Sequence, residues 1–183
     1  MKGSTYFRQL RKNVTQEEAN KAIYSAAVTI VSEVGERIFQ QGKATDGSDI
    51  GKYDTEKELY VNPKKAPKSF PKKGKEGTAK FKNGKPHKTG YFESYSAYRK
   101  KVGRQSNKVN LVLFGVLQSD FVKAPFIIND AVVVRVSKNN NDKIEGAENR
   151  YGKEIFSLSE KERKTYRSLV NEQLKEQILK NAK

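Results

Sequence analysis

Five acidic residues in one short stretch are the first candidates for chemistry, because clustered carboxylates can hold the cation of a calcium loop or a nuclease: Asp46, Asp49, Asp54, Glu56 and Glu58. A calcium loop carries Asp at alternate positions, Gly at the sixth and Glu at the twelfth. Here Gly47 directly follows Asp46, so the spacing does not match. Turn-forming Asp and Ser residues explain the stretch at least as well. We therefore expect a loop without a metal ion.

A second set of residues could serve a metal-dependent nuclease if the fold brought the carboxylates beside a lysine: Asp120, Asp130, Glu145, Glu148 and Lys153. No spacing among them indicates such a geometry. In a chain with 21 acidic residues, sets of this kind arise by chance. A nuclease is therefore a minor alternative.

Other catalytic groups are scarce. His87 is the only histidine and lies in a lysine-rich stretch, where a solvated loop side chain is the simplest interpretation. The chain has no cysteine, which excludes thiolate zinc sites and thiol nucleophiles. Glycine-rich phosphate loops and the nucleophile elbow of hydrolases are also absent from the sequence. We therefore expect no enzyme activity, no cofactor and no metal.

Positive charge is the strongest signal in the composition. The 183 residues include 37 Lys and Arg against 21 Asp and Glu, a net charge of +16. Between Asn62 and Arg104, fourteen basic residues stand against two acidic ones, so +12 of this charge lies in one window and only +4 in the rest. Such a window is typical of contact with an anionic partner. The basic residues expected to make that contact are Lys64, Lys65, Lys68, Lys72, Lys73, Lys75, Lys80, Lys82, Lys85, Lys88, Arg99, Lys100, Lys101 and Arg104.

The window begins with a stretch, residues 62–88, that holds four of the five prolines and few apolar side chains. Such a segment buries too little apolar surface to offset the entropy of ordering. We expect a flexible basic loop inserted into a single domain that spans residues 1–183. Interleaved Phe and Tyr residues could make the window a nucleic-acid-binding module, through phosphate neutralisation and base stacking. A solvated charge run, or a loop that folds on a neighbouring subunit, explains the same pattern.

Two amphipathic helices and three apolar segments surround this window. A capping box at Thr15 predicts a helix over residues 15–41, and a second one at Ser159 predicts another that runs to the C-terminus. Apolar segments at 91–102, 109–117 and 131–136 predict strands. The expected fold is α+β, with both helices packed on a small antiparallel sheet of three or four strands. No apolar run has the length of a signal peptide or a membrane span, so we expect a soluble protein without a membrane partner.

Several short strings, in their order along the chain, resemble the virion-morphogenesis or tail-completion family of tailed bacteriophages. In that family a long N-terminal helix leads into a stretch of the type I-F-x-x-x-G-x-x-x-D-G-S and then an aromatic residue. This chain has Ile38-Phe39 with Gly42, then Asp46-Gly47-Ser48 and Tyr53. A Thr-Gly pair after a basic insertion looks like Thr89-Gly90, and a string before the last helix looks like residues 149–159.

The resemblance implies a non-catalytic structural protein of the virion that forms a ring, hexameric by this expectation, at the neck between head and tail. The implied partners are further copies of the chain, connector or adaptor proteins, tail-tube or terminator proteins, and DNA in the lumen. The implied location is the virion, with the host cytoplasm during assembly. Tail completion and tail termination both stay open as the role.

Overall fold

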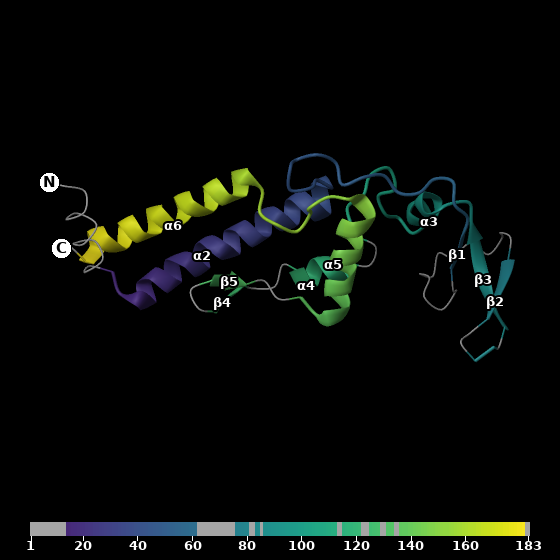
Figure 1. The fold of residues 1–183 in the computed structure, drawn as a ribbon, viewed down its shortest axis with the longest axis horizontal. Helices are drawn as coiled ribbons and strands as arrows, with labels where there is room; N and C mark the ends of the chain where they lie inside the picture. The colour runs from purple at the N-terminus through teal and green to yellow at the C-terminus, as the bar shows by residue number, and fades with distance from the viewer. Residues whose placement is uncertain are drawn as a thin grey trace.

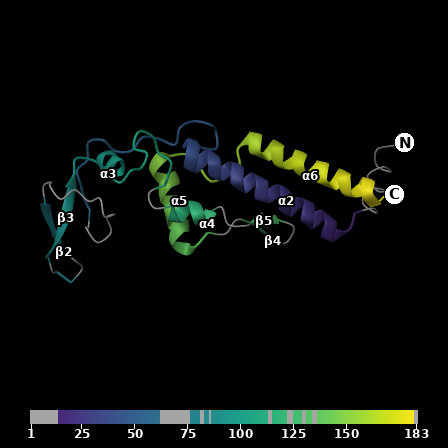
Figure 2. The same ribbon diagram turned by 180° about the vertical axis from the view of Figure 1, so that it is seen from behind.

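A computed structural model describes residues 14–61, 76–80, 83–84, 86–112, 115–121, 125–128, 131–133 and 136–181. The molecule is elongated (Figure 1). A pair of long helices occupies one end, two shorter helices lie in the middle, and a small sheet lies at the opposite end (Figures 1 and 2). None of the described helices is long and apolar enough to cross a membrane.

Helix α2 (Gln16–Gly35) begins at the predicted capping box, in which the Glu18 N–H donates to the Thr15 hydroxyl and the Thr15 N–H donates to the Glu18 carboxylate. It continues as a π-helical turn, η1 (Glu36–Gln41), whose wider winding adds one more turn to the helix. Gly42 ends this turn with a φ of 67° in the left-handed region, where glycine is favoured. The N-terminal helix predicted from the sequence is confirmed.

Helix α6 (Glu160–Asn181) lies beside α2 along most of its length (Figures 1 and 2). Its capping box is also present, because the Glu162 N–H donates to the Ser159 hydroxyl and the Ser159 N–H donates back to the Glu162 carboxylate. Asn181 near its end donates to Glu18 near the start of α2, so the two helices are antiparallel. The predicted C-terminal helix is confirmed.

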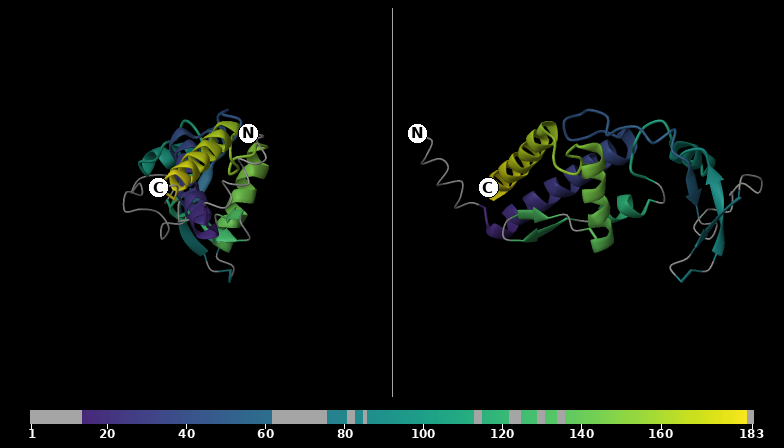
Figure 3. Two further views of the ribbon diagram at one scale, coloured as in Figure 1. Left: turned by 90° about the vertical axis from the view of Figure 1, so that its left-hand side faces the viewer. Right: turned by 45° about the vertical axis from the view of Figure 1, so that its right-hand side comes forward.

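Helices α4 (Val116–Phe121) and α5 (Lys138–Tyr151) lie in the middle of the molecule, on the other side of α2 from α6 (Figure 3). Three phenylalanine rings from distant parts of the chain meet here. The Phe39 ring lies 5.8 Å from that of Phe121 and 6.4 Å from that of Phe156. The core buried around them consists of Ile30, Val31, Val34, Ile38, Ala44, Ile50, Tyr53, Val109, Leu117, Ala147 and Ile155.

The strands form two separate antiparallel sheets. Strands β1 (Leu59–Val61), β2 (Glu76–Lys80) and β3 (Pro86–Phe92) pair in the order β1-β3-β2 at the far end of the molecule. Strands β4 (Phe126–Ile128) and β5 (Ala131–Val133) form a two-stranded ribbon beside α2. The two sheets do not join, so neither is a platform for both long helices.

The predicted α+β fold, with a three- or four-stranded sheet under both helices, is therefore wrong: the described structure is mostly helical. The first predicted strand, 91–102, becomes a helix after Ser94. The Ser94 hydroxyl accepts from the Ala97 N–H and caps helix α3 (Tyr95–Lys101). The second, 109–117, is interrupted by a positive φ at Leu111 and then enters α4. An apolar run alone does not distinguish a strand from other buried segments. In these two segments the helix cap at Ser94 and the positive φ of Leu111 set the conformation.

The predicted flexible loop at 62–88 lies partly outside the described residues, which omit 62–75. Its later part contains β2 and the beginning of β3, which pair in register with Gly77 opposite Thr89. In the part of this segment that the structure describes, residues 76–80 and 86–88 therefore lie in hydrogen-bonded strands.

Candidate functional site

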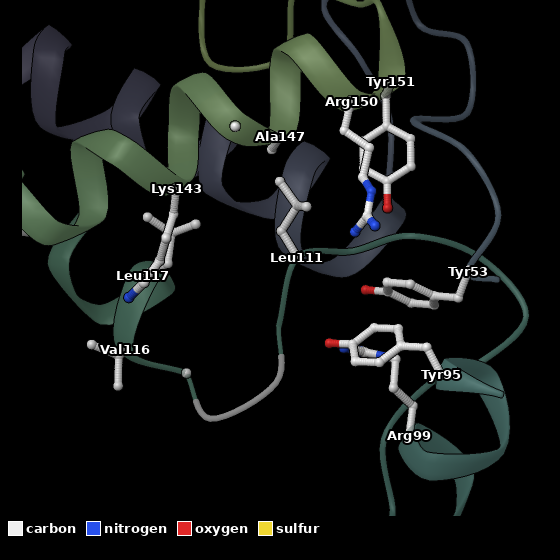
Figure 4. A pocket seen from close by; sticks show the side chains of 12 residues that line it. Tyr53, Tyr95, Arg99, Leu111, Val116, Leu117, Lys143, Ala147, Arg150 and Tyr151 are labelled. Carbon is white, nitrogen blue, oxygen red and sulfur yellow. The ribbon is translucent and has the colours of Figure 1, made fainter. Parts of the chain in front are cut away.

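A cleft between α5 and the start of α3 is the best-formed concave site near the predicted basic window (Figure 4). Its volume is about 450 Å³. We call it the tyrosine cleft, because Tyr53, Tyr95 and Tyr151 line it; Arg150 and Lys143 are its exposed cations. Aliphatic side chains complete the wall, among them Leu111, Leu117 and Ala147.

Arg99 lies beneath this cleft, on α3, and is only 1 % exposed. Its guanidinium donates to the Gln105 carbonyl at 2.7 Å, the Val112 carbonyl at 2.6 Å and the Asn110 side-chain oxygen at 2.9 Å. All three acceptors are neutral, and Arg99 forms no ion pair with a carboxylate among the described residues. The Arg99 charge is therefore buried and uncompensated within this part of the chain.

The aromatic wall packs directly on this cation. The Arg99 guanidinium carbon lies 4.0 Å from the centre of the Tyr53 ring, a cation–π contact. Tyr95 meets Tyr53 edge to face, with their ring centres 5.4 Å apart. The Tyr53 hydroxyl accepts from the Asn110 N–H and donates to the Asn110 side chain, which holds the ring in place. This wall is preorganised by contacts within the chain.

The opposite wall comes from α5, where Arg150 and Tyr151 point from the helix end toward Tyr53 (Figure 4). The Tyr151 ring rests on Gly51, where an added Cβ would lie only 2.9 Å from the ring. Burial raises the pKa of Tyr151, and burial likewise raises the pKa of Tyr53. Both hydroxyls therefore stay protonated at neutral pH and can donate hydrogen bonds.

A second hollow of about 500 Å³ adjoins the cleft and shares Tyr53, Tyr95, Arg150 and Tyr151 with it. Two acidic residues line this hollow, Asp54 and Glu58, together with lysines 52 and 57. The Asp54 carboxylate accepts from the backbone N–H groups of Lys57 and Glu56, and these bonds lower its pKa. The charged residues that line the cleft are thus all cations, while the adjoining hollow has both cations and carboxylates.

The predicted basic residues divide into four groups. Lys64, Lys65, Lys68, Lys72, Lys73, Lys75, Lys82 and Lys85 lie outside the described residues. Two further lysines, Lys80 and Lys88, belong to strands β2 and β3. The exposed cations at the end of α3 are Lys100, Lys101 and Arg104. Arg99 is buried, and its guanidinium donates to carbonyl groups of the following loop, so it is not exposed at the surface.

The carboxylates of Asp46 and Asp49 bind groups of their own loop. The Asp46 carboxylate accepts from the Ser48 hydroxyl and N–H, and these bonds lower its pKa. The hydrogen bond and ion pair with Lys43, at 2.7 Å, lower the pKa of Asp49. Among the described residues, no three His, Asp or Glu side chains are grouped to hold a metal ion.

The residues of the nuclease alternative also have structural partners. Asp120 accepts from the Ser137 N–H and the Asn140 side chain, and Glu148 accepts from two backbone N–H groups at 155 and 156. Lys153 donates to the Ser48 hydroxyl and the Asp49 carbonyl, far from Asp120 in the fold. Asp130 lies outside the described residues. The structure does not bring this set together.

Sequence reasoning missed Arg150 and Tyr151 as site residues, and it missed Arg37, which is buried near α6. Arg37 had a signal, because it is a cation directly beside Ile38 in the apolar stripe of its helix. Arg150 had none, since an exposed cation at a helix end is ordinary.

No protein-family model matches the chain, and searches of the curated proteins and of the solved structures found no match either.

Proposed function

We propose that this chain is a structural protein of a tailed bacteriophage, a ring-forming head–tail joining or tail-completion component at the neck. The observation that carries the proposal is spatial. Two of the three stretches by which the chain resembles that family, 38–53 and 149–159, are far apart in sequence but pack against each other; the third, Thr89-Gly90, lies on β3. Short strings that form one structural unit are better support for a resemblance than strings scattered over the surface.

Several contacts join these stretches. The Thr45 N–H donates to the Glu154 carbonyl at 2.9 Å, and the Lys153 ammonium donates to the Ser48 hydroxyl at 2.9 Å. The Tyr151 ring covers Gly51 at the same junction. All of these contacts stabilise the fold of the protomer, so the motif residues form one packed unit.

The shape of the protomer also supports assembly. A ring requires two different surfaces on each copy that bind each other. The elongated body offers separate ends, the α2–α6 pair at one and the β1-β3-β2 sheet at the other (Figure 1). On α2, Tyr24 and Val28 lie one helical turn apart and remain 40 % and 43 % exposed, an apolar strip suited to a neighbour.

The test is the oligomeric state of the full chain, measured by light scattering and negative-stain microscopy, together with its incorporation into phage particles. We expect closed rings, alone or on the connector or tail. Replacing Tyr24 and Val28 by Ser should weaken the ring, whereas replacing the exposed Lys175 by Ser on α6 should not. A strict monomer at high concentration that joins no particle would overturn the proposal.

DNA binding is a second candidate, supported by the exposed Lys100, Lys101 and Arg104 at the end of α3. It predicts an affinity for DNA that falls steeply with salt, because phosphate contacts release counterions. Neutralising these three residues to Gln should make the dependence on salt shallower. Absence of DNA binding at low salt would remove this candidate.

A further inference from the structure

We propose that the tyrosine cleft is a docking site for an acidic segment of a partner protein, in which a carboxylate side chain lies next to an apolar one. One carboxylate binds Arg150, a second reaches Lys143 at the other end of the cleft, and the apolar side chain packs on the aliphatic wall between them. The inference rests on the proposed function in taking the occupant to be a protein of the assembly. Binding itself can be measured on the isolated chain.

Charge is the first argument. Three cations line the cleft, namely Arg99, Lys143 and Arg150, and no carboxylate does. Buried charges are normally paired, because removing a charge from water is costly. Arg99 is 1 % exposed and is bonded only to neutral oxygens, so no described carboxylate neutralises its charge behind the Tyr53 ring. An anion in the cleft would supply the missing countercharge.

The exposed cations are placed to make direct contact. Arg150 is exposed, forms no ion pair with a described carboxylate, and points between Tyr53 and Tyr151 (Figure 4). Lys143 lies two helical turns earlier on α5, and its ammonium is already oriented by the Asn140 side-chain oxygen at 2.6 Å. Guanidinium groups bind carboxylates in two parallel hydrogen bonds, which adds geometric selectivity.

Size and neighbouring charge favour a peptide over nucleic acid. A volume of about 450 Å³ holds a few side chains but not a run of nucleotides. The adjoining hollow, where Asp54 and Glu58 stand beside lysines 52 and 57, has mixed charge and not the continuous positive track that a phosphate backbone follows. A peptide with one or two acids followed by polar residues needs no such track. The half-exposed Tyr95 and the 57 % exposed Val116 add apolar surface at the rim.

The experiment uses the full chain and a fluorescein-labelled peptide, Gly-Glu-Phe-Asp-Leu-Gly, with fluorescence anisotropy and backbone NMR shifts as readouts. We expect binding, with shifts grouped at residues 53, 95 and 147–151. The matched peptide with Gln and Asn in place of Glu and Asp should bind at least about tenfold more weakly, the size of one lost charged hydrogen bond. Equal binding of both peptides, or none, overturns the inference.

Variants locate the site. Arg150→Ala and Lys143→Ala should each weaken the acidic peptide by about tenfold, and Arg150→Glu should reverse the preference toward a Lys-containing peptide. Arg167→Ala on α6 and Lys138→Ala on α5 are matched controls with exposed cations outside the cleft, and they should bind normally. Circular dichroism checks that each variant is folded.

Single-stranded oligothymidylate is the competing probe. If it binds through Arg150 while the acidic peptide does not, the occupant is nucleic acid and the inference is wrong. Peptide binding by a chain that forms no ring would uphold the cleft and contradict the proposed function. Rings without peptide binding would uphold the proposed function and contradict the cleft as a docking site.

Discussion

The Arg37 guanidinium and the Glu162 carboxylate form an ion pair at 2.8 Å, although 125 residues separate them. Both side chains are nearly buried, at 10 % and 7 % exposure. Arg37 also donates to the carbonyls of Lys43, Ile155 and Ser157, so one side chain joins the end of the N-terminal helix to the start of the last helix. Glu162 is at the same time the capping residue of α6, which couples the cap to the core.

Breaking this pair from one side should be strongly destabilising. Arg37→Met leaves the Glu162 charge and three carbonyl oxygens without their donor. We expect a loss of about 3–5 kcal/mol in the free energy of unfolding, measured by urea denaturation. Lys21→Met is the control, because its pair with Glu17 is 72 % and 78 % exposed and should contribute little to stability. Equal losses in the two variants would contradict this reading of the pair.

The stability of the fold should fall at acidic pH because the Glu162 carboxylate becomes protonated. Desolvation acts to raise the pKa of Glu162, but hydrogen bonds from Arg37 and Ser159 outweigh it, and the pKa lies below its ordinary value of 4.5. A depressed pKa in the folded state gives stability that is present above the unfolded pKa and is lost as the pH falls through the folded one. We expect the free energy of unfolding to decline below about pH 4.5, and Glu162→Gln to decline less. Denaturation with urea on both sides of this pH measures the slope; an unchanged slope in the variant would refute the assignment.

Gly42 should tolerate no side chain. Its φ is 67°, and an added Cβ would lie 2.4 Å from the Val109 carbonyl oxygen. Gly47 has a similar φ of 83° but nothing within 4 Å of the added atom, so it is the matched control. Gly47→Ala should cost about 1–2 kcal/mol from backbone strain alone. Gly42→Ala should cost clearly more, because a backbone atom must also move, and thermal unfolding of the two variants compares them.

Arg99 should not be replaceable by lysine. A single ammonium cannot reach the carbonyls of Gln105 and Val112 together with the Asn110 side chain, whereas the planar guanidinium does. We expect Arg99→Lys to lose about 2 kcal/mol of stability, as buried acceptors lose their donors. The exposed neighbour Lys100→Arg should be neutral. If Arg99→Lys unfolds at the same urea concentration as the unmodified chain, the network does not stabilise the fold.

Both long helices could be predicted from sequence because their signals are local. A capping box at Thr15 or Ser159 involves residues three apart, and each apolar stripe repeats within the helix itself. The end of the N-terminal helix at Gly42, after η1, was likewise predictable from the glycine. The three apolar segments between the helices had no comparable local signal, and their assignment as one sheet was wrong. Ser94 and Leu111 determined the conformations of the first two segments, through a cap and a positive φ that an apolar run does not reveal. The third segment, 131–136, was predicted correctly as a strand over residues 131–133, which form β5.

The amino-acid sequence by itself determined the two capped helices and the concentration of positive charge between residues 62 and 104, because these depend on neighbours along the chain. Only the tertiary structure decided which cations are buried. Arg99 belongs to the basic window in sequence, yet it is enclosed by carbonyls and a tyrosine ring. Arg150, far from that window, became the exposed cation of the cleft. Burial is set by contacts between residues distant in the chain, so composition locates charge without telling which charges can meet a partner.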